Sequence, residues 1–240
     1  MARAPDPNLR LLIAVAQALG ELRERFVFVG GCATGLLITD PAAPAVRPTR
    51  DVDVIVEAGA LLEYRQIGRA LEAKGFSQPL AAGDPPYRWT GRDGSKLDVM
   101  PTEEGILGFS NRWYREAIRA AREIALRDDL SIRLVTAPYF VATKYEAFIG
   151  RGRGDYLASH DFEDLMAVID GRPELEAELS AASAQLRKHI AGVIGKTIAD
   201  DRFRAVVGGF VIEEGGSPDR ASVLVARMRR LAELAKLLPR

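Results

Sequence analysis

The sequence predicts an α+β protein: a small mixed β-sheet with flanking helices in the first half, followed by an all-helical C-terminal domain. Three observations predict this class. Short β-branched and aromatic runs bounded by glycine or proline recur up to about residue 135. Beyond Pro138, apolar residues follow helical spacing. The 240 residues are 48% hydrophobic, which is enough to bury a core. We therefore expect domains at 1–136 and 137–240.

Each element of the first half rests on a local pattern. Apolar residues at helical spacing predict the first helix, and apolar alternation with β-branching predicts the strand at 51–56. Gly75 marks the end of another helix, because glycine readily adopts the left-handed conformation that closes helices. In chain order we expect a helix at about 8–25, a strand at 26–29, a short helix at 33–38, a strand at 51–56, a helix at 59–74, strand candidates within 76–94, a strand at 96–100, a helix near 111–122 and β-runs near 123–126 and 131–135.

Breaks that contain glycine divide the helical half at 150–154, 171–173 and 215–218. Within the last break, Ser217 is a capping residue and Pro218 suits a first helical turn. The final helix, about 218–238, has a broad apolar face that core packing explains. Basic residues of this half are candidates for a patch that binds an RNA backbone, and a solvated cationic face is the alternative. These residues are Arg187, Lys188, Arg202, Arg204, Arg227, Arg229 and Arg230.

Composition excludes several classes of protein. Thirty-three basic residues balance 33 acidic ones, so no overall field attracts the chain to nucleic acid or membrane. The single cysteine, Cys32, excludes an intramolecular disulfide framework and a cysteine-rich zinc site. The longest early apolar run, residues 11–16, is too short to span a membrane and lacks a signal-peptide cleavage pattern. We expect a cytoplasmic protein with no membrane partner.

Three aspartates lie where they suit a metal ion. Asp51 and Asp53 are two residues apart on one expected strand, so their side chains share a face. Asp98 lies on a second short strand, and the three carboxylates converge if the strands are neighbours. A bound divalent cation removes the repulsion between such carboxylates, and Mg²⁺ prefers oxygen ligands of this kind. Two ions about 4 Å apart align the attacking and leaving oxygens of a phosphoryl-type transfer. The alternative is an edge strand whose acids face water.

The surrounding residues favour the metal site. Gly30 and Gly31 close the preceding strand, allow a phosphate to approach the backbone, and with the following helix form an anion site. A tight turn is the alternative for this pair. Arg47 and Thr49 precede the acids and offer a guanidinium and a hydroxyl to a phosphate. The combination is more specific than any of its members.

These motifs resemble a known family. FVGGCAT at 28–34, followed by RPTRDVDV at 47–54, resembles the first motif of the polymerase-β-like nucleotidyltransferase superfamily, with the AbiEii/AbiGii type as the best match. Asp98 stands where that family has its third acid. KYEAFIGR at 144–151 is similar to the family's Lys-x-x-Ala-x-x-x-Arg motif, and DFEDL at 161–165 is similar to its Asp-x-x-Asp-Leu motif. The resemblance spans roughly residues 26 to 170.

The resemblance implies a Mg²⁺-dependent nucleotidyltransferase that moves an NMP from an NTP to an acceptor hydroxyl and releases pyrophosphate. It implies two Mg²⁺ ions, with Mn²⁺ as the alternative, and a toxin of a toxin–antitoxin pair that acts on RNA, such as tRNA, and has a cognate antitoxin protein as a partner. The implied metal ligands are Asp51, Asp53 and Asp98. The implied nucleotide-binding residues are Gly30, Gly31, Arg47, Thr49, Lys144, Arg151 and Asp161. Asp164 is implied as a fourth catalytic residue, acting as a general base or orienting Lys144.

Two positions depart from the family pattern. Cys32 stands where many members have serine, and a thiol is a weak hydrogen-bond donor. His160 stands directly before the Asp-x-x-Asp-Leu motif, where the family often has a basic residue. Both bear on phosphate contacts and nucleotide preference more than on the metal site. Two other interpretations of the whole chain stay open: transfer to a small molecule (an antibiotic) or a protein, and a non-catalytic NTP-binding regulatory module.

Overall fold

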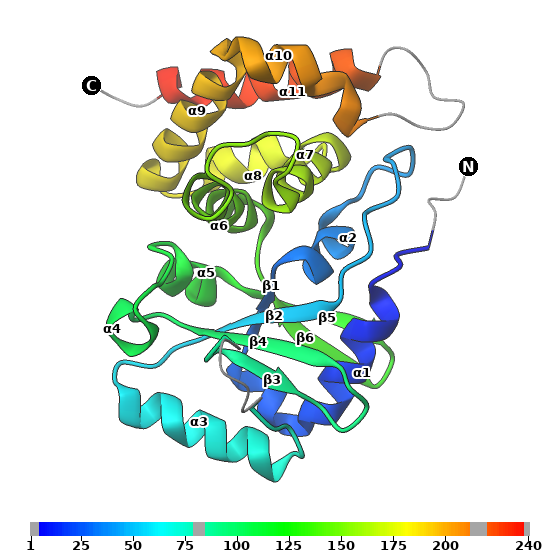
Figure 1. The fold of residues 1–240 in the computed structure, drawn as a ribbon. Helices are drawn as coiled ribbons and strands as arrows, with labels where there is room; N and C mark the ends of the chain where they lie inside the picture. Colours follow the sequence, from blue (N-terminus) through cyan, green and yellow to red (C-terminus); the bar gives the residue numbers. More distant parts are fainter. Residues whose placement is uncertain (1–4, 79–84, 212–219, 238–240) are drawn as a thin grey trace. The chain divides into compact units, whose positions relative to one another are not determined.

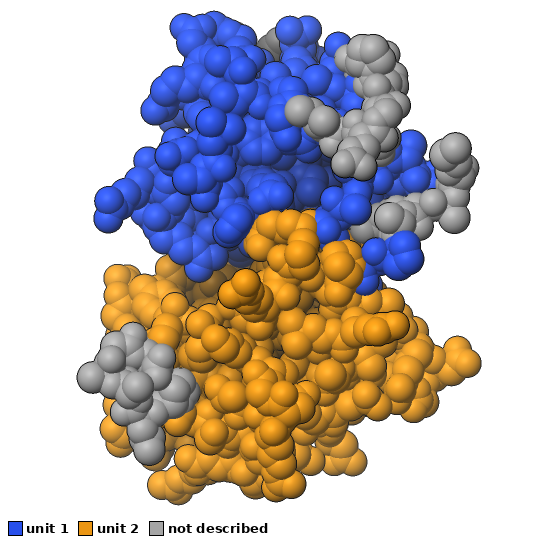
Figure 2. Space-filling view, turned by 45° about the vertical axis from the view of Figure 1, so that its right-hand side comes forward, with its two compact units in different colours: residues 1–6, 36–46, 137–240 blue, residues 7–35, 47–136 orange. Residues whose placement is uncertain are grey.

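The computed structural model describes residues 5–78, 85–211 and 220–237. Contacts divide the chain into two compact units (Figure 2). One unit, called the sheet unit, is formed by residues 7–35 and 47–136. The other, called the helical unit, holds residues 1–6, 36–46 and 137–240. The sheet unit ends at residue 136, and the segment 36–46, although it precedes most of the strands in the sequence, groups with the helices.

The described part of the sheet unit contains a six-stranded mixed sheet with the order β3-β4-β2-β1-β6-β5 (Figure 1). The strands are β1 (Val27–Val29), β2 (Asp51–Val56), β3 (Arg88–Thr90), β4 (Lys96–Pro101), β5 (Arg122–Arg127) and β6 (Leu130–Leu134). β2 is antiparallel to β1 and parallel to β4, and β3 and β5 pair antiparallel at the two edges. The expected α+β class is confirmed, and β2 lies inside the sheet beside β4.

Burial explains why these segments form strands. All three residues of β1 are buried, as expected of a strand with neighbours on both sides. β2 alternates between half-buried and buried residues over its first four positions, so Asp51 and Asp53 share the less buried face. The β5–β6 hairpin confirms the two β-runs expected near 123–126 and 131–135.

Helices flank the sheet within this unit. They are α1 (Leu9–Leu19), a 3₁₀ segment at Gly20–Arg25, a 3₁₀ turn at Gly31–Ala33, α2 (Thr34–Leu37), α3 (Leu61–Ala73), α4 (Glu104–Leu107) and α5 (Tyr114–Ala120), with α2 leading into the segment 36–46. α1 buries Leu12, Val15, Ala16 and Leu19, which lie on one helical face.

Several expected boundaries differ from those observed. The first helix does not continue to residue 25, because Gly20 adopts a φ of 57° and the chain tightens into 3₁₀ geometry. Gly75 has a φ of 89°, which confirms it as the residue that follows a helix end. The helix expected near 111–122 corresponds to α5, which is shorter, and a further short helix, α4, precedes it. Within 76–94, β3 and a bridge between Ser77 and Thr90 form, while residues 79–84 lie outside the described part.

The helical unit contains, in its described residues, α6 (Ala137–Gly150), α7 (His160–Gly171), α8 (Leu175–Ala181), α9 (Ala184–Ala199), α10 (Asp201–Val206), a 3₁₀ turn at Val207–Phe210, α11 (Arg220–Glu233) and a 3₁₀ turn at Leu234–Leu237. The breaks expected at 150–154 and 171–173 are confirmed, because α6 ends at Gly150 and α7 at Gly171. The third expected break, with Ser217 and Pro218, lies outside the described residues. None of the described helices is long and apolar enough to cross a membrane.

An aromatic cluster holds the helical unit together. The Phe148 and Phe162 rings lie 4.6 Å apart between centroids, and Tyr156 packs against both at 5.3 and 4.8 Å. Phe203 of α10 contacts Tyr156 and Phe162, so the cluster joins α6, α7 and α10. Buried aromatic pairs of this kind add about 0.5–1.5 kcal/mol beyond the area they bury.

Candidate functional site

The register of two parallel strands brings the candidate metal ligands together. Asp53 of β2 and Asp98 of β4 are direct partners across the ladder, and Asp51 pairs with Lys96. Because neighbouring parallel strands lie about 4.8 Å apart, the two paired aspartates stand next to each other. Asp98 is 4% exposed, and Asp51 and Asp53 are half-buried. The expectation that the two strands are neighbours is therefore confirmed.

The glycine turn after β1 lies directly against Asp53. Gly30 has a φ of 72°, a conformation that L-residues rarely adopt, and a Cβ atom at this position would overlap the Asp53 carboxylate. Gly30 is therefore required both by its backbone conformation and by the space that Asp53 occupies. The turn lets a carboxylate, and by the same geometry a phosphate, approach the main chain.

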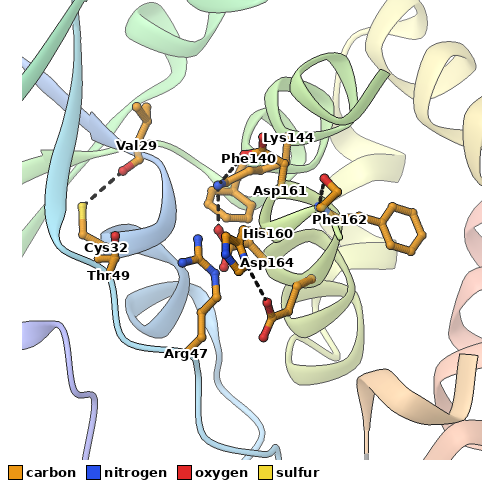
Figure 3. A network of polar contacts seen from close by, with 12 residues as sticks. Val29, Cys32, Arg47, Thr49, Phe140, Lys144, His160, Asp161, Phe162 and Asp164 are labelled. Carbon is orange, nitrogen blue, oxygen red and sulfur yellow. Dashed lines mark hydrogen bonds and ion pairs between the residues drawn. The ribbon is translucent and has the colours of Figure 1, made fainter. Parts of the chain in front are cut away.

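The helix that follows the turn is shorter than expected. It consists of one 3₁₀ turn and the four residues of α2, so its dipole contributes less to anion binding than a full helix would. The hydroxyl of Thr34 is buried there and has no hydrogen-bond partner among the described residues. Cys32 is also buried, and its thiol donates to the carbonyl of Val29 at 3.3 Å (Figure 3), which agrees with a structural role.

Asn8 positions the segment that leads into β2. Its side-chain amide donates to the carbonyl of Arg47 at 3.0 Å, and its side-chain oxygen accepts from the Thr49 amide at 2.8 Å. Asn8 is 1% exposed, so these bonds are shielded from water. The Thr49 hydroxyl in turn donates to Asp51 Oδ1 at 3.0 Å. The structure thus links both expected phosphate-binding residues to the start of the carboxylate strand.

Arg88 pairs with two of the three carboxylates. Its Nε donates to Asp98 Oδ1 at 2.8 Å, and its Nη2 donates to Asp98 Oδ2 at 2.7 Å and to Asp51 Oδ2 at 2.8 Å. Hydrogen bonding to Asp98 raises the pKa of the guanidinium above its already high ordinary value, so Arg88 is a permanent cation. The pair with Asp98 is bidentate, which is the strongest arrangement available to these two side chains.

Sequence reasoning did not single out Arg88 or Asn8. A signal for Arg88 exists, because the Gly-Arg-Asp-Gly turn at 91–94 joins two short β-runs, and folding these back as a hairpin places Arg88 opposite Asp98. For Asn8, its position before the first helix indicates a helix cap. In the structure its side chain instead forms hydrogen bonds with residues 39 and 41 positions further along the chain, and no local sequence pattern predicts such bonds.

The carboxylates fit a divalent cation in chemistry, although they do not yet form a complete ligand set. Among the described residues, no three His, Cys, Asp or Glu side chains are arranged to hold a metal ion. Two of the three aspartates instead share a cation that belongs to the protein, the Arg88 guanidinium. Carboxylate oxygens on adjacent strands are the donors that Mg²⁺ and Mn²⁺ prefer. The donor set therefore suits such an ion.

A second charged network lies in the helical unit. Lys144 Nζ of α6 contacts Asp164 Oδ2 at 2.6 Å and Asp161 Oδ1 at 3.0 Å, both on α7 (Figure 3). Arg151 forms a bidentate pair with Asp161, at 2.6 and 2.8 Å. Ser159 caps α7 by accepting from the Phe162 amide. The Lys144 and Asp164 side chains are only 6% and 2% exposed, so this is a buried network.

The charges of this network satisfy one another. Burial raises the pKa of Asp161, but the hydrogen bonds from Arg151 and the charge of Lys144 outweigh it and lower that pKa to about 2. Asp164 and Lys144 form an ion pair, while the catalytic role of Asp164 and the nucleotide-binding roles of Lys144, Arg151 and Asp161 stay predictions. His160 contacts Glu163 on the surface, with 75% of its side chain exposed.

Most of the candidate basic patch is engaged in ion pairs. Arg227 pairs with Asp40, Arg230 with Glu176, Arg202 with Asp200, and Arg204 with Asp201. Arg187 donates to the Ser180 carbonyl. Carboxylates beside these arginines reduce the field that would attract an RNA backbone.

Comparison with known proteins yields a distant likeness among solved structures. No protein-family model and no curated protein matches the chain. Among solved structures, it is similar to the crystal structure of an antigenic nucleotidyltransferase-like protein from Paracoccidioides brasiliensis. The sequences are 20% identical, the TM-score is 0.43, and the match covers 73% of this chain and 83% of that one. The interpretation of the site therefore rests on its own residues.

Proposed function

We propose that the protein is a metal-dependent nucleotidyltransferase, which moves an NMP from an NTP to an acceptor hydroxyl and releases pyrophosphate. The observation that carries this proposal is the strand register that sets Asp53 beside Asp98, with Asp51 on the same face. The Gly30 turn, which brings the main chain against Asp53, supports it. Carboxylates grouped beside a turn that an anion can approach are suited to a metal–triphosphate substrate.

In this proposal Asp51, Asp53 and Asp98 hold Mg²⁺ or Mn²⁺, one ion or two. A divalent ion held by these aspartates would offset the negative charge of the triphosphate and of the pyrophosphate that leaves. Gly30, Gly31, Arg47 and Thr49 contact the phosphates, and Asn8 fixes the segment that holds the last two. The acceptor hydroxyl gives up its proton to solvent, and its oxygen forms a bond to the α-phosphorus while the bond between that phosphorus and the bridging oxygen breaks and pyrophosphate leaves. Positioning and charge neutralisation supply most of the rate enhancement.

For the acceptor we propose RNA, tRNA in particular, as the resemblance to AbiEii-type toxins implies. The ion pairs of Arg202, Arg204, Arg227 and Arg230 favour a second candidate, transfer to a small molecule or a protein, because they leave less cationic surface for an RNA backbone.

The test is incubation of the protein with Mg²⁺, each α-labelled NTP in turn, and total cellular RNA, with RNA-free and protein-supplemented reactions in parallel. Label in a discrete RNA band supports the proposed acceptor and identifies the nucleotide. Label in a protein or small molecule without RNA favours the second candidate. NTP binding without transfer to any acceptor contradicts the enzyme and indicates a regulatory module.

A further inference from the structure

Arg88 occupies the place that the proposed metal ion needs. Its guanidinium takes both oxygens of Asp98 and one of Asp51 at 2.7–2.8 Å, and the other oxygen of Asp51 accepts from Thr49. Two of the three proposed metal ligands are thus engaged by one cation of the protein itself. A divalent ion bound by the same oxygens would lie within a few ångströms of the guanidinium, and like charges at that distance repel strongly.

The location of Arg88 allows its guanidinium to move away from the carboxylates. β3 is an edge strand of three residues, and the Arg88 side chain is 24% exposed, so part of this side chain already reaches solvent. Asp98 cannot leave in the same way, because its side chain is 6% exposed. Leaving a buried, ionised carboxylate without a counter-ion is costly, so a cation that displaces Arg88 from Asp98 must take over its role.

We infer that Arg88 is the resident counter-ion of the carboxylate site and competes with the divalent cation for Asp51 and Asp98. In the metal-free protein Arg88 neutralises these aspartates and stabilises the fold. When the metal–nucleotide substrate enters, the guanidinium gives up the carboxylates and turns toward solvent. This inference rests on the proposed function, because it assumes that Asp51, Asp53 and Asp98 are the metal ligands.

The experiment measures Mn²⁺ affinity, by electron paramagnetic resonance and by calorimetry, for the full-length wild type and its variants. Arg88→Gln removes the charge, and Arg88→Lys keeps the charge but cannot form the bidentate pair. Arg65→Gln, at an exposed position of α3, is the matched control. Asp53→Asn tests whether the bound Mn²⁺ occupies the proposed site.

Competition predicts that Arg88→Gln binds Mn²⁺ at least about tenfold more tightly than the wild type, equal to about 1.4 kcal/mol. Arg88→Lys should lie between the two, and Arg65→Gln should not differ from the wild type. Without metal, Arg88→Gln should melt at a lower temperature than the wild type. Saturating Mn²⁺ should raise the melting temperature of Arg88→Gln by more than it raises that of the wild type. If Arg88→Gln does not fold, Arg88→Lys carries the test.

Two results overturn the inference, and they are distinguishable. If the wild type binds Mn²⁺ in a way that Asp53→Asn abolishes, but the Arg88 variants bind it equally or more weakly, then Arg88 does not compete and the proposed function stands. If neither the wild type nor the Arg88 variants bind Mn²⁺ with or without NTP, the metal site itself is wrong.

Discussion

Replacing Lys144 by methionine should destabilise the protein strongly. Methionine has a similar length but no charge, so the substitution removes the ammonium group from two carboxylates while largely preserving volume. Asp161 still has its bidentate partner Arg151, whereas Asp164, 2% exposed, loses an ion pair of 2.6 Å. Removing one partner of a buried ion pair costs about 3–5 kcal/mol, because the remaining charge stays in a poorly solvated place.

The assay is urea denaturation at pH 7, followed by circular dichroism and by tryptophan fluorescence. Lys188→Met, on the exposed face of α9, is the matched control and should change the free energy of unfolding by less than about 0.5 kcal/mol. Adding Asp164→Asn to Lys144→Met should recover at least about 1 kcal/mol, because the charge without its partner is then gone.

A loss below about 1 kcal/mol in Lys144→Met would refute this reasoning, since it would show that the ion pairs contribute little to the fold. The variant also separates two roles of Lys144. If Lys144 serves mainly to bind a triphosphate, its replacement lowers NTP affinity while the free energy of unfolding stays near that of the wild type.

Three further predictions follow from other parts of the structure. Gly30→Ala should lower the free energy of unfolding by about 1–3 kcal/mol, because alanine is strained at positive φ and its Cβ overlaps the Asp53 carboxylate; thermal melts and Mn²⁺ binding measure it, and an unchanged Mn²⁺ affinity would contradict the proposed geometry. The pKa of Asp161 falls from 3.8 to about 2 on folding, so its ionised form adds about 2 kcal/mol to the free energy of unfolding. This contribution is fully present above about pH 4 and disappears as the pH falls toward 2. Urea midpoints across that range should show the loss, and a much smaller loss in Arg151→Gln would confirm its cause. Asn8→Ala should lower the free energy of unfolding by about 1–3 kcal/mol, because it removes the buried hydrogen bonds to the Arg47 carbonyl and from the Thr49 amide. Hydrogen exchange at the Thr49 amide would report the change, and unaltered protection there would contradict the prediction.

Strands and helices with a strong local pattern could be predicted from the sequence. The alternation of aspartate and β-branched residues places β2 at residues 51–56 because the pattern repeats along a single strand. The same reasoning identifies β4, and the approach of Asp53 to Asp98 follows once the two strands are assumed to pair. The helix ends just before Gly75 and at Gly150 and Gly171 are local in the same sense.

Features that depend on contacts between distant segments could not be predicted in this way. The segment 36–46 follows the sheet-forming residues, yet its Thr39 and Asp40 amides donate to the Gly171 carbonyl at the end of α7. That pairing becomes visible only when the tertiary contacts are known. Lys144 shows the same limit in part. The family resemblance implies that Asp164 orients Lys144, but no local pattern predicts the contact with Asp161 or the burial of this network.

The most direct test of the central claim compares pyrophosphate release by the wild type, Asp53→Asn and Asp129→Asn, each with Mg²⁺, the preferred NTP and the acceptor. Asp129 lies at the exposed turn between β5 and β6, so its substitution controls for the loss of one carboxylate. The account predicts that Asp53→Asn loses at least about a hundredfold in turnover, with an unchanged circular dichroism spectrum, while Asp129→Asn retains wild-type turnover. Wild-type turnover in a folded Asp53→Asn variant would contradict the account.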